Sequence, residues 1–344
     1  MVDAKENCGK IVDMNKLRSI VSICVLLALL LTLQCCAQRQ PDEPEAATTT
    51  AKASEPPQNT QPPARTEPTP PQKTTILYFS DMQADPDTGD YSGLGNLVSQ
   101  ALMGRERPDF AIIGGDSVND GGDEVEWRLF HDVTNSLFDG LTTASVAGNH
   151  DNYALLSKQF DFPKEAPAKQ GQGFFYTLDA GSVFFIMLDS NIMGAANDVD
   201  IRWLQEILQS DAARQADWLV AVSHHPMWPV SINPKDAERA GIMRESFLPI
   251  LEEFGVSLVL CGHQHVYSRT LPMREDSAAD DGSGIVQVMA ASGDKPTYAM
   301  GDWDYVAATA PAPNFALLSA DSESLRLTAF DAENSVIDEI TIVK

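Results

Sequence analysis

Short apolar runs alternate with amphipathic segments through the middle of the chain. Seven runs have the length and the content of β-branched and aromatic residues that are typical of buried strands. They are ILYFS (76–80), DFAIIGGD (109–116), TTASVAGNHD (142–151), GFFYTLDA (173–180), SVFFIMLDS (182–190), WLVAVSHH (218–225) and VSLVLCGHQH (256–265). Between several of them, segments such as 124–138 and 200–210 place apolar residues three and four positions apart, which predicts helices. This strand–helix–strand order predicts a mainly parallel sheet covered by helices.

The pattern changes after Gly284. Four strand-like runs, IVQVMAAS, NFALLSA, SLRLTAF and VIDEITIV, follow one another without a long helix between them. They predict a second, more antiparallel sheet that packs on the first. The expected fold is therefore one α/β domain in which two sheets lie between helices.

The N-terminal residues 1–37 have the organisation of a targeting segment. A short basic start after Met14 leads into an apolar core from Ile20 to Leu33, and small residues follow it, as in a secretory signal peptide. The apolar core is short for a membrane-spanning helix, which needs about 20 residues. The segment therefore predicts a signal peptide or an uncleaved signal anchor, with Met14 as a candidate true start.

A linker without hydrophobic patterning follows the leader. Residues 38–73 consist largely of Pro, Thr, Ala, Glu and Gln, which predicts a disordered tether. Both a lipid on Cys35 or Cys36 and cleavage after Ala37 fit the end of the leader, so we expect an exported protein that is periplasmic, extracellular or anchored to a membrane as a lipoprotein. Beyond the leader the chain has Cys261 as its single cysteine, which leaves no internal disulfide.

The charge of the chain is strongly acidic. The 344 residues contain 24 Lys and Arg against 49 Asp and Glu, a formal net charge of −25. This balance argues against nucleic acid, or an anionic membrane surface, as a partner held by general electrostatics. An anionic substrate would have to be held by cations inside a site.

Polar residues that commonly ligate metals follow five of the strand-like runs. The turns read FSDMQ, IIGGDS, VAGNHD, VSHHP and LCGHQH, and only His131 of the six histidines lies outside them. Ligands of open α/β sheets bind beyond the carboxyl ends of the strands, so we expect these turns to converge on one place.

The side chains in these turns form a mixed set of oxygen and nitrogen donors. Carboxylates, amide oxygens and imidazoles suit divalent ions such as Mn, Fe, Zn or Mg, and there are enough donors for two ions. In an extended segment, residues two apart point the same way, so His263 and His265 face one side and two neighbouring ions could take one imidazole each. The candidate metal ligands are Asp81, Gln83, Asp116, Asn149, His224, His263 and His265.

The order of the motifs resembles the calcineurin-like metallophosphoesterase superfamily. DMQ, GDSVNDGG, GNHD, HHP and GHQH stand where that family has DxH, GDxxxxxG, GNH with an acid, a lone His and GHxH. The resemblance covers about residues 75–269 and implies, for residues 74–344, the four-layer αββα fold with two mixed β-sheets sandwiched between helices. Gln83 departs from the family's histidine. The GHQHVYSRT region is also similar to purple acid phosphatases, but Asn119 replaces their tyrosine, which tells against their charge-transfer iron site.

The resemblance also implies roles for the candidate residues. One divalent ion would be held by Asp81, Gln83, Asp116 and His265, and the other by Asp116, Asn149, His224 and His263. His225 is the alternative to His224. His150, oriented by Asp151, would protonate the leaving group while a metal-bridging hydroxide attacks the phosphorus of a small phosphate ester, either a monoester or a diester.

Two other functions fit parts of the sequence. GGDS resembles the serine block of GDSL-type esterases, with Ser117 as the nucleophile, but no histidine follows His265 and that family needs one near its C-terminus. Gln83 fits a catalytically degenerate metallophosphoesterase domain that acts as a binding module. Because every other expected donor and His150 are present, an exported metal-dependent phosphoesterase accounts best for the motifs.

Overall fold

The computed structural model describes residues 73–103, 107–160, 162–163, 174–192 and 198–344. The predicted leader and all of the predicted linker except Lys73 lie outside these residues. Within the described ranges, no helix combines the length and the apolar character needed to cross a membrane.

One mixed sheet combines the first strands of the described chain with its last. Its order is β15-β14-β13-β1-β2-β3, with β1 parallel to β2, β2 parallel to β3, and β13 antiparallel to β1. The strands are β1 (Thr74–Phe79), β2 (Phe110–Ile113), β3 (Thr142–Ser145), β13 (Asn314–Ala320), β14 (Ser324–Asp331) and β15 (Val336–Val343).

A second mixed sheet has the order β12-β8-β11-β7-β6-β5-β4. Its four central strands, β11, β7, β6 and β5, are parallel, and antiparallel strands complete both edges. The strands are β4 (Tyr176–Ala180), β5 (Val183–Leu188), β6 (Trp218–Ser223), β7 (Leu258–Cys261), β8 (Val266–Thr270), β11 (Val286–Met289) and β12 (Val306–Pro311). A separate small ribbon pairs β9 (Met273–Arg274) with β10 (Ser277–Ala278).

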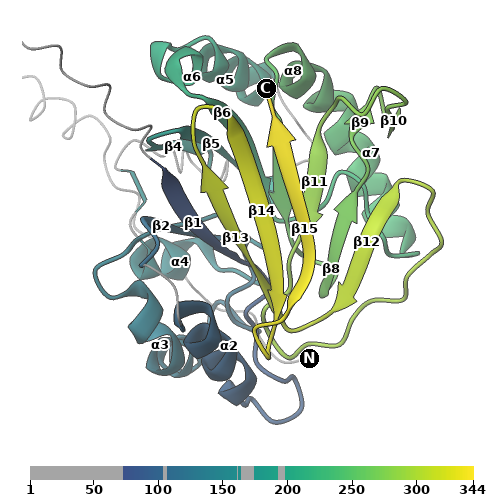
Figure 1. Cartoon of the computed structure of the whole chain (residues 1–344). Helices are drawn as coiled ribbons and strands as arrows, with labels where there is room; N and C mark the ends of the chain where they lie inside the picture. The colour runs from purple at the N-terminus through teal and green to yellow at the C-terminus, as the bar shows by residue number, and fades with distance from the viewer. Residues whose placement is uncertain (1–72, 104–106, 161, 164–173, 193–197) are drawn as a thin grey trace, which may run out of the picture. The chain divides into compact units, whose positions relative to one another are not determined.

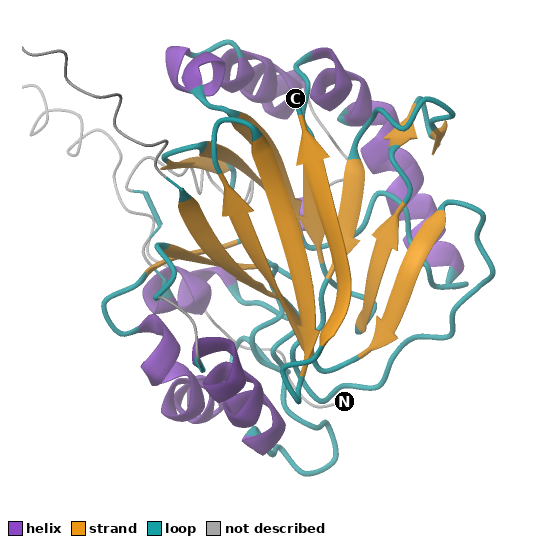
Figure 2. Cartoon of the chain, viewed as in Figure 1, coloured by secondary structure: helices purple, strands orange, loops and turns teal. Residues whose placement is uncertain are grey.

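Helices flank the two sheets on opposite sides. Figure 1 shows α2, α3 and α4 gathered beside β1 and β2, while α5, α6, α7 and α8 lie beyond the second sheet, and Figure 2 separates helices from strands by colour. The bounds are α2 (Ser92–Leu102), α3 (Glu124–Phe138), α4 (Tyr153–Gln159), η1 (Ser190–Ile192), α5 (Asp198–Leu208), α6 (Asp211–Gln215), α7 (Pro234–Ser246) and α8 (Leu248–Glu253). The predicted fold of two mixed β-sheets between helices is confirmed.

The strand β5 shows why these layers form. All six of its residues are buried, so both of its faces must be covered by apolar side chains. Phe185 and Met187 belong to the core that the two sheets share, whereas Phe184 and Ile186 belong to a second core that includes side chains of α5 to α8.

The strands after Gly284 do not form the predicted second sheet together, although β13, β14 and β15 pair antiparallel as expected, within the first sheet. β11 enters the second sheet parallel to β7, with Val286 opposite Leu258, while β13 pairs with β1 in the first sheet. The four residues of β11 are all buried, which requires neighbours on both sides. An apolar run specifies burial but not the partner strand, because pairing is decided by residues far away in the sequence.

Hydrogen bonds from tyrosines join the two sheets. The Tyr78 hydroxyl of β1 donates to the Cys261 carbonyl of β7 at 2.7 Å. Between two other strands of the sheets, the Tyr267 hydroxyl of β8 donates to Asp338 Oδ2 of β15 at 2.7 Å, and Arg269 Nε contacts the same oxygen at 2.6 Å. The first bond holds the ends of β1 and β7 together, directly before Asp81 and His263.

Candidate metal centre

The five motif turns follow strands from both sheets. Asp81, Asp116 and Asn149 come after β1, β2 and β3, and His224 and His263 come after β6 and β7. Short distances join the turns across the sheets, including 3.3 Å between His224 Nε2 and Asp116 Oδ2. The expectation that the turns converge therefore agrees with the structure.

Asp81 has one carboxylate oxygen held by the protein and one without a partner. Oδ2 accepts hydrogen bonds from Ser80 Oγ and from the backbone N–H of His263, both at 2.7 Å. Oδ1 is buried, has no hydrogen-bond partner in the described part of the chain, and lies 3.6 Å from His265 Nε2. Burial, with a smaller contribution from Asp116, raises the pKa of Asp81 to about 7.

Asp116 lies between the two halves of the predicted ligand set. Its Oδ1 accepts the backbone N–H of His150 at 2.8 Å, and its Oδ2 lies 3.3 Å from His224 Nε2 and 3.5 Å from Gln83 Nε2. This is the place that a ligand shared between two ions would take. Burial alone would raise the pKa of Asp116, but the adjacent His224 outweighs it and holds this pKa well below its usual range.

Gln83 is completely buried beside Asp116. Its amide nitrogen faces the carboxylate, and its oxygen Oε1 has no hydrogen-bond partner among the described residues. A half turn of the amide exchanges these two atoms and would present the oxygen to a cation.

Backbone carbonyls fix two of the histidine rings. His224 Nδ1 lies 2.8 Å from the Gly114 carbonyl, and His265 Nδ1 lies 2.9 Å from the Pro296 carbonyl. Because a carbonyl only accepts, each Nδ1 carries the hydrogen, so Nε2 is the nitrogen that faces the site. Metal-ligating histidines are typically oriented in this way. Burial alone would lower the pKa of His224, but Asp116 outweighs it and raises this pKa to about 9.

A buried carboxylate fixes the third ring. His263 Nε2 lies 3.2 Å from Asp236 Oδ1, while His263 Nδ1 is buried and meets no hydrogen-bond partner within the described ranges. Asp236 was missed in the sequence, although Asn233 and Pro234 are typical of a helix start and place it in the first turn of α7. Asp236 also accepts hydrogen bonds from Ser231 Oγ at 2.5 Å and from Gln264 Nε2 at 2.8 Å.

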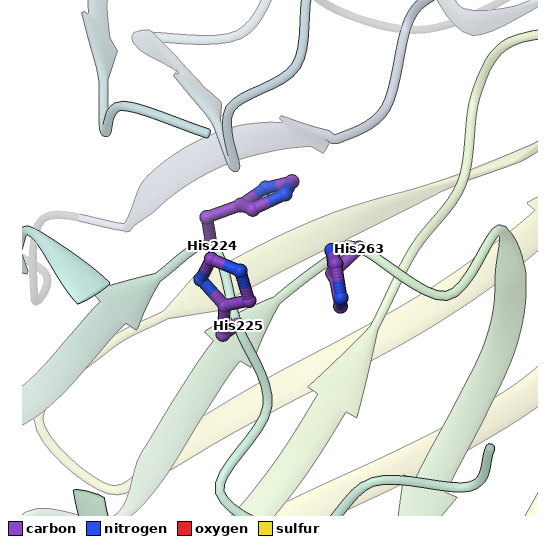
Figure 3. A group of neighbouring side chains, drawn as sticks. All are labelled: His224, His225 and His263. Carbon is purple, nitrogen blue, oxygen red and sulfur yellow. The ribbon is translucent and has the colours of Figure 1, made fainter. Parts of the chain in front are cut away.

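His224 and His225 leave the end of β6 in different directions. Figure 3 shows both rings together with His263, which lies on the neighbouring turn. His224 Nε2 also lies 3.2 Å from Asn149 Oδ1, whereas His225 Nδ1 lies 2.8 Å from Ser190 Oγ. The geometry favours His224 as the imidazole beside Asp116, while the ring of His225 lies 4.3 Å from the ring of His263, centre to centre.

The backbone at the site is held in unusual conformations. Asp81, Asp116, His263 and His265 have φ values of 49°, 53°, 79° and 53°, in the left-handed region that non-glycine residues seldom adopt. Such strain persists only where the surrounding structure enforces it, and it is typical of functional sites. The site is also closely packed, because a Cβ atom on Gly148 would lie 2.1 Å from Asp116 Oδ1.

His150 lies beside the donor set, but it is not oriented by Asp151. Its Nδ1 is 2.6 Å from the Asn119 carbonyl. Asp151 Oδ2 instead accepts the backbone N–H groups of Asp116 at 2.9 Å and Gly148 at 2.8 Å, which ties two motif turns together. The carbonyl of Asn119 therefore takes the orienting position that the sequence assigned to Asp151.

A lysine that the sequence did not indicate completes the surroundings of His150. Lys295 is half-buried, and its Nζ lies 3.1 Å from His150 Nε2. It follows β11 in a segment pinned to the first motif turn, where the Gly293 N–H donates to the Asp81 carbonyl at 2.8 Å. Burial lowers the pKa of Lys295 from its ordinary value.

The arrangement fits divalent cations. Asp81 Oδ1, Gln83 Oε1 and His263 Nδ1 are buried polar atoms with no hydrogen-bond partner among the described residues, and such atoms are costly unless something binds them. Ligand atoms of Asp81, Asp116 and His224 all lie within 4.8 Å of one another. Carboxylate, amide and imidazole donors at this spacing are those that Mn, Fe, Zn or Mg use in proteins.

Ser117 does not have the surroundings of an esterase nucleophile. Its side chain is fully buried, and its Oγ has no hydrogen-bond partner among the described residues. A nucleophilic serine needs an adjacent base, so the geometry does not support the serine esterase alternative.

Comparison with known proteins gives a consistent result. A sequence model of the calcineurin-like phosphoesterase family matches residues 74–267, more than half of the chain. Purple acid phosphatase 15 of Arabidopsis thaliana is 29% identical over 155 residues, which cover 43% of this chain and 29% of the relative. Glycerophosphodiester phosphodiesterase GpdQ of Enterobacter lignolyticus is 28% identical over 187 residues, which cover 52% and 64%.

A solved structure shares the fold. Purple acid phosphatase PPD1 from yellow lupin seeds superimposes with a TM-score of 0.67 at 19% identity, over 79% of this chain and 54% of the lupin chain. The matched part of this chain spans less than two thirds of the length of each of these three proteins.

Proposed function

Because the chain belongs to the calcineurin-like phosphoesterase family, we propose that it is a metal-dependent hydrolase of small-molecule phosphate esters. The observation that carries the proposal is the set of buried, unpartnered donor atoms around Asp116. Relatives named as phosphatases and as a phosphodiesterase support ester hydrolysis and leave both ester types within the proposal.

Seven side chains would hold two divalent ions, with Asp116 shared between them. The distances support the division inferred from the motifs, since His265 approaches Asp81 and His224 approaches Asn149. When bound, the ions would supply positive charge that neutralises phosphoryl oxygens and activates water for attack on phosphorus. The ligands would be Asp81, Gln83, Asp116, Asn149, His224, His263 and His265.

His150 would supply the proton that the leaving group needs. With Nδ1 bonded to the Asn119 carbonyl, Nε2 is the nitrogen that remains, and in the imidazolium form it can give its proton to the departing ester oxygen. Asp151 would act indirectly, because its bonds to the N–H groups of Asp116 and Gly148 keep the two motif turns in register.

We place the enzyme outside the cytoplasm. The proposal rests on the apolar core of residues 20–33 and on the linker of residues 38–73, which would hold the catalytic part away from a membrane if the leader is retained or lipidated.

The test combines metal analysis with turnover. The purified protein should bind two ions per chain by elemental analysis, and hydrolyse p-nitrophenyl phosphate or bis-p-nitrophenyl phosphate with at least one of Mn, Fe, Zn and Mg. His150→Ala should keep both ions and lose about 10² to 10⁴-fold in kcat on an ester of a poorly acidic alcohol. A folded protein that binds no metal and turns over neither ester would contradict the proposal and favour the degenerate binding module that Gln83 suggests.

A further inference from the structure

Lys295 is a cation at the proposed site that no described carboxylate neutralises. Its Nζ forms no ion pair with an acidic side chain of the described residues, in contrast to Arg269, which pairs with Asp338. Its side chain is half-buried, and the negative charges of Asp116, Asp81 and Glu126 act on it from beyond ion-pair distance. A partly dehydrated ammonium without a direct ion-pair partner gains from an anion that binds to it.

The hydrogen bond that Lys295 makes is one that an anion would replace. His150 Nδ1 donates to the Asn119 carbonyl, so Nε2 is an acceptor and receives a hydrogen from the ammonium across 3.1 Å. A phosphoryl oxygen carries negative charge and accepts more strongly than a neutral imidazole. A phosphate bound between His150 and Asp116 would therefore take over the hydrogen bond from the ammonium and free Nε2 to take up a proton from solvent and pass it to the leaving group.

The fold fixes the position of this ammonium. Lys295 follows the carboxyl end of β11, which lies parallel to β7, and its segment is held to the first motif turn by the N–H groups of Gly293 and Asp294, which donate to the carbonyls of Asp81 and Gln83. A Cβ on Gly293 would lie 2.2 Å from the Gln83 carbonyl oxygen, so the segment packs directly against that turn. Lys295 is therefore presented by a rigid element.

We propose that Lys295 binds the phosphoryl group of the substrate and favours phosphomonoesters over diesters. The proposal rests on the proposed phosphoesterase function and names its substrate class. A monoester presents three non-bridging oxygens and up to two negative charges, whereas a diester presents two such oxygens and one charge. An additional ammonium therefore gains more from a monoester, and Lys295 keeps its proton throughout.

The experiment compares Lys295→Met with Lys295→Arg on the metal-loaded protein. For Lys295→Met, kcat/KM for p-nitrophenyl phosphate should fall about 10- to 100-fold, the range expected for losing a hydrogen bond to a charged group. For bis-p-nitrophenyl phosphate the fall should be smaller, because a diester presents one negative charge and two non-bridging oxygens to the ammonium. Lys295→Arg should recover part of the loss on the monoester because it restores the charge.

Lys158→Met is the matched control, because Lys158 is an exposed lysine of α4 whose replacement changes the net charge by the same amount. It should leave both rate constants unchanged. An equal loss on the two esters with Lys295→Met, or no loss on the monoester, would overturn the proposal.

Binding of inorganic phosphate separates this inference from the proposed function. The dissociation constant of phosphate for the metal-loaded protein, measured by calorimetry, should rise about 10- to 100-fold in Lys295→Met. If the wild-type protein hydrolyses neither ester but shows this difference, the proposed hydrolysis fails and the phosphate site stands. If phosphate does not bind to the wild type, or binds equally well to Lys295→Met, the inference falls.

Discussion

Replacing Asp236 by Asn should weaken the binding of one of the two proposed metal ions without unfolding the protein. In the structure, Asp236 accepts from His263 Nε2 at 3.2 Å, from Gln264 Nε2 at 2.8 Å and from Ser231 Oγ at 2.5 Å. An asparagine keeps the shape but turns one acceptor oxygen into an NH₂ donor. The NH₂ then faces either His263 Nε2 together with Asn233 Nδ2, which donates to Oδ1 at 3.2 Å, or Gln264 Nε2 together with Ser231 Oγ.

The size of the effect follows from which side the NH₂ takes. Gln264 cannot turn its amide round, because its Oε1 accepts the N–H groups of Val230 and Ser231 at 2.7 and 3.1 Å. If the NH₂ faces His263, it donates to Nε2 and therefore favours the His263 tautomer with hydrogen on Nδ1. Nδ1 is the nitrogen that would bind metal. Loss of such an orienting partner typically costs 10- to 100-fold in metal affinity, about 1.4 to 2.8 kcal/mol.

The assay is a chelator-buffered titration of Zn²⁺ or Mn²⁺ that resolves the two binding events. We expect one dissociation constant to rise about 10- to 100-fold in Asp236→Asn and the other to stay unchanged. Ser231→Ala is the matched control, because it removes a hydrogen bond to Asp236 and leaves the acceptor of His263 in place. If folded Asp236→Asn binds both ions as tightly as the wild type, Asp236 does not orient a ligand.

Three further predictions concern the same site. The pKa of Asp81 is raised to about 7, so protons compete with a metal ion for this carboxylate below that pH. In chelator-buffered titrations, the affinity for that ion should fall about tenfold per pH unit below pH 7. Binding that does not depend on pH between pH 5 and 7 would contradict this. Gln83→His should raise metal affinity or shift preference toward Zn, and equal affinities would remove Gln83 from the ligand set. Gly148→Ala places a Cβ 2.1 Å from Asp116 Oδ1 and should lower the free energy of unfolding, measured in urea, by about 1 to 3 kcal/mol. Gly241→Ala is the control, because a Cβ there has nothing within 4 Å and should not destabilise the protein. Equal effects of the two changes would argue against steric crowding at Asp116.

The wrong prediction for β11 explains why Lys295 was missed. The residues after five strand-like runs are predicted to meet because the carboxyl ends of parallel strands lie at one edge of a sheet. For VQVM, residues 286–289, the pattern predicts an antiparallel strand, so the rule does not extend to the GDKP that follows it. In the structure, β11 is parallel to β7, and the same rule applies to it.

The orientation of His150 shows another limit of sequence reasoning. Asp151 was expected to orient the ring because it is the neighbouring residue. The backbone instead directs the Asp151 carboxylate toward the N–H groups of Asp116 and Gly148, and the Asn119 carbonyl, from a different turn, reaches His150. Adjacency in sequence does not determine which side chains meet, because successive residues of a turn point in different directions.

The sequence by itself determined where the strands lie and which ligand-type residues follow them. Apolar runs mark the strands because burial depends on each run's own composition, and the polar residues that follow them identify the donor types of the proposed metal site. The tertiary structure decided which strands pair, which oxygen of Asp81 is left without a partner, and which nitrogen of His263 is free. Those outcomes depend on contacts between residues far apart in the sequence, such as the bond from His263 N–H to Asp81 Oδ2, which joins residues 182 positions apart, and no local pattern encodes them.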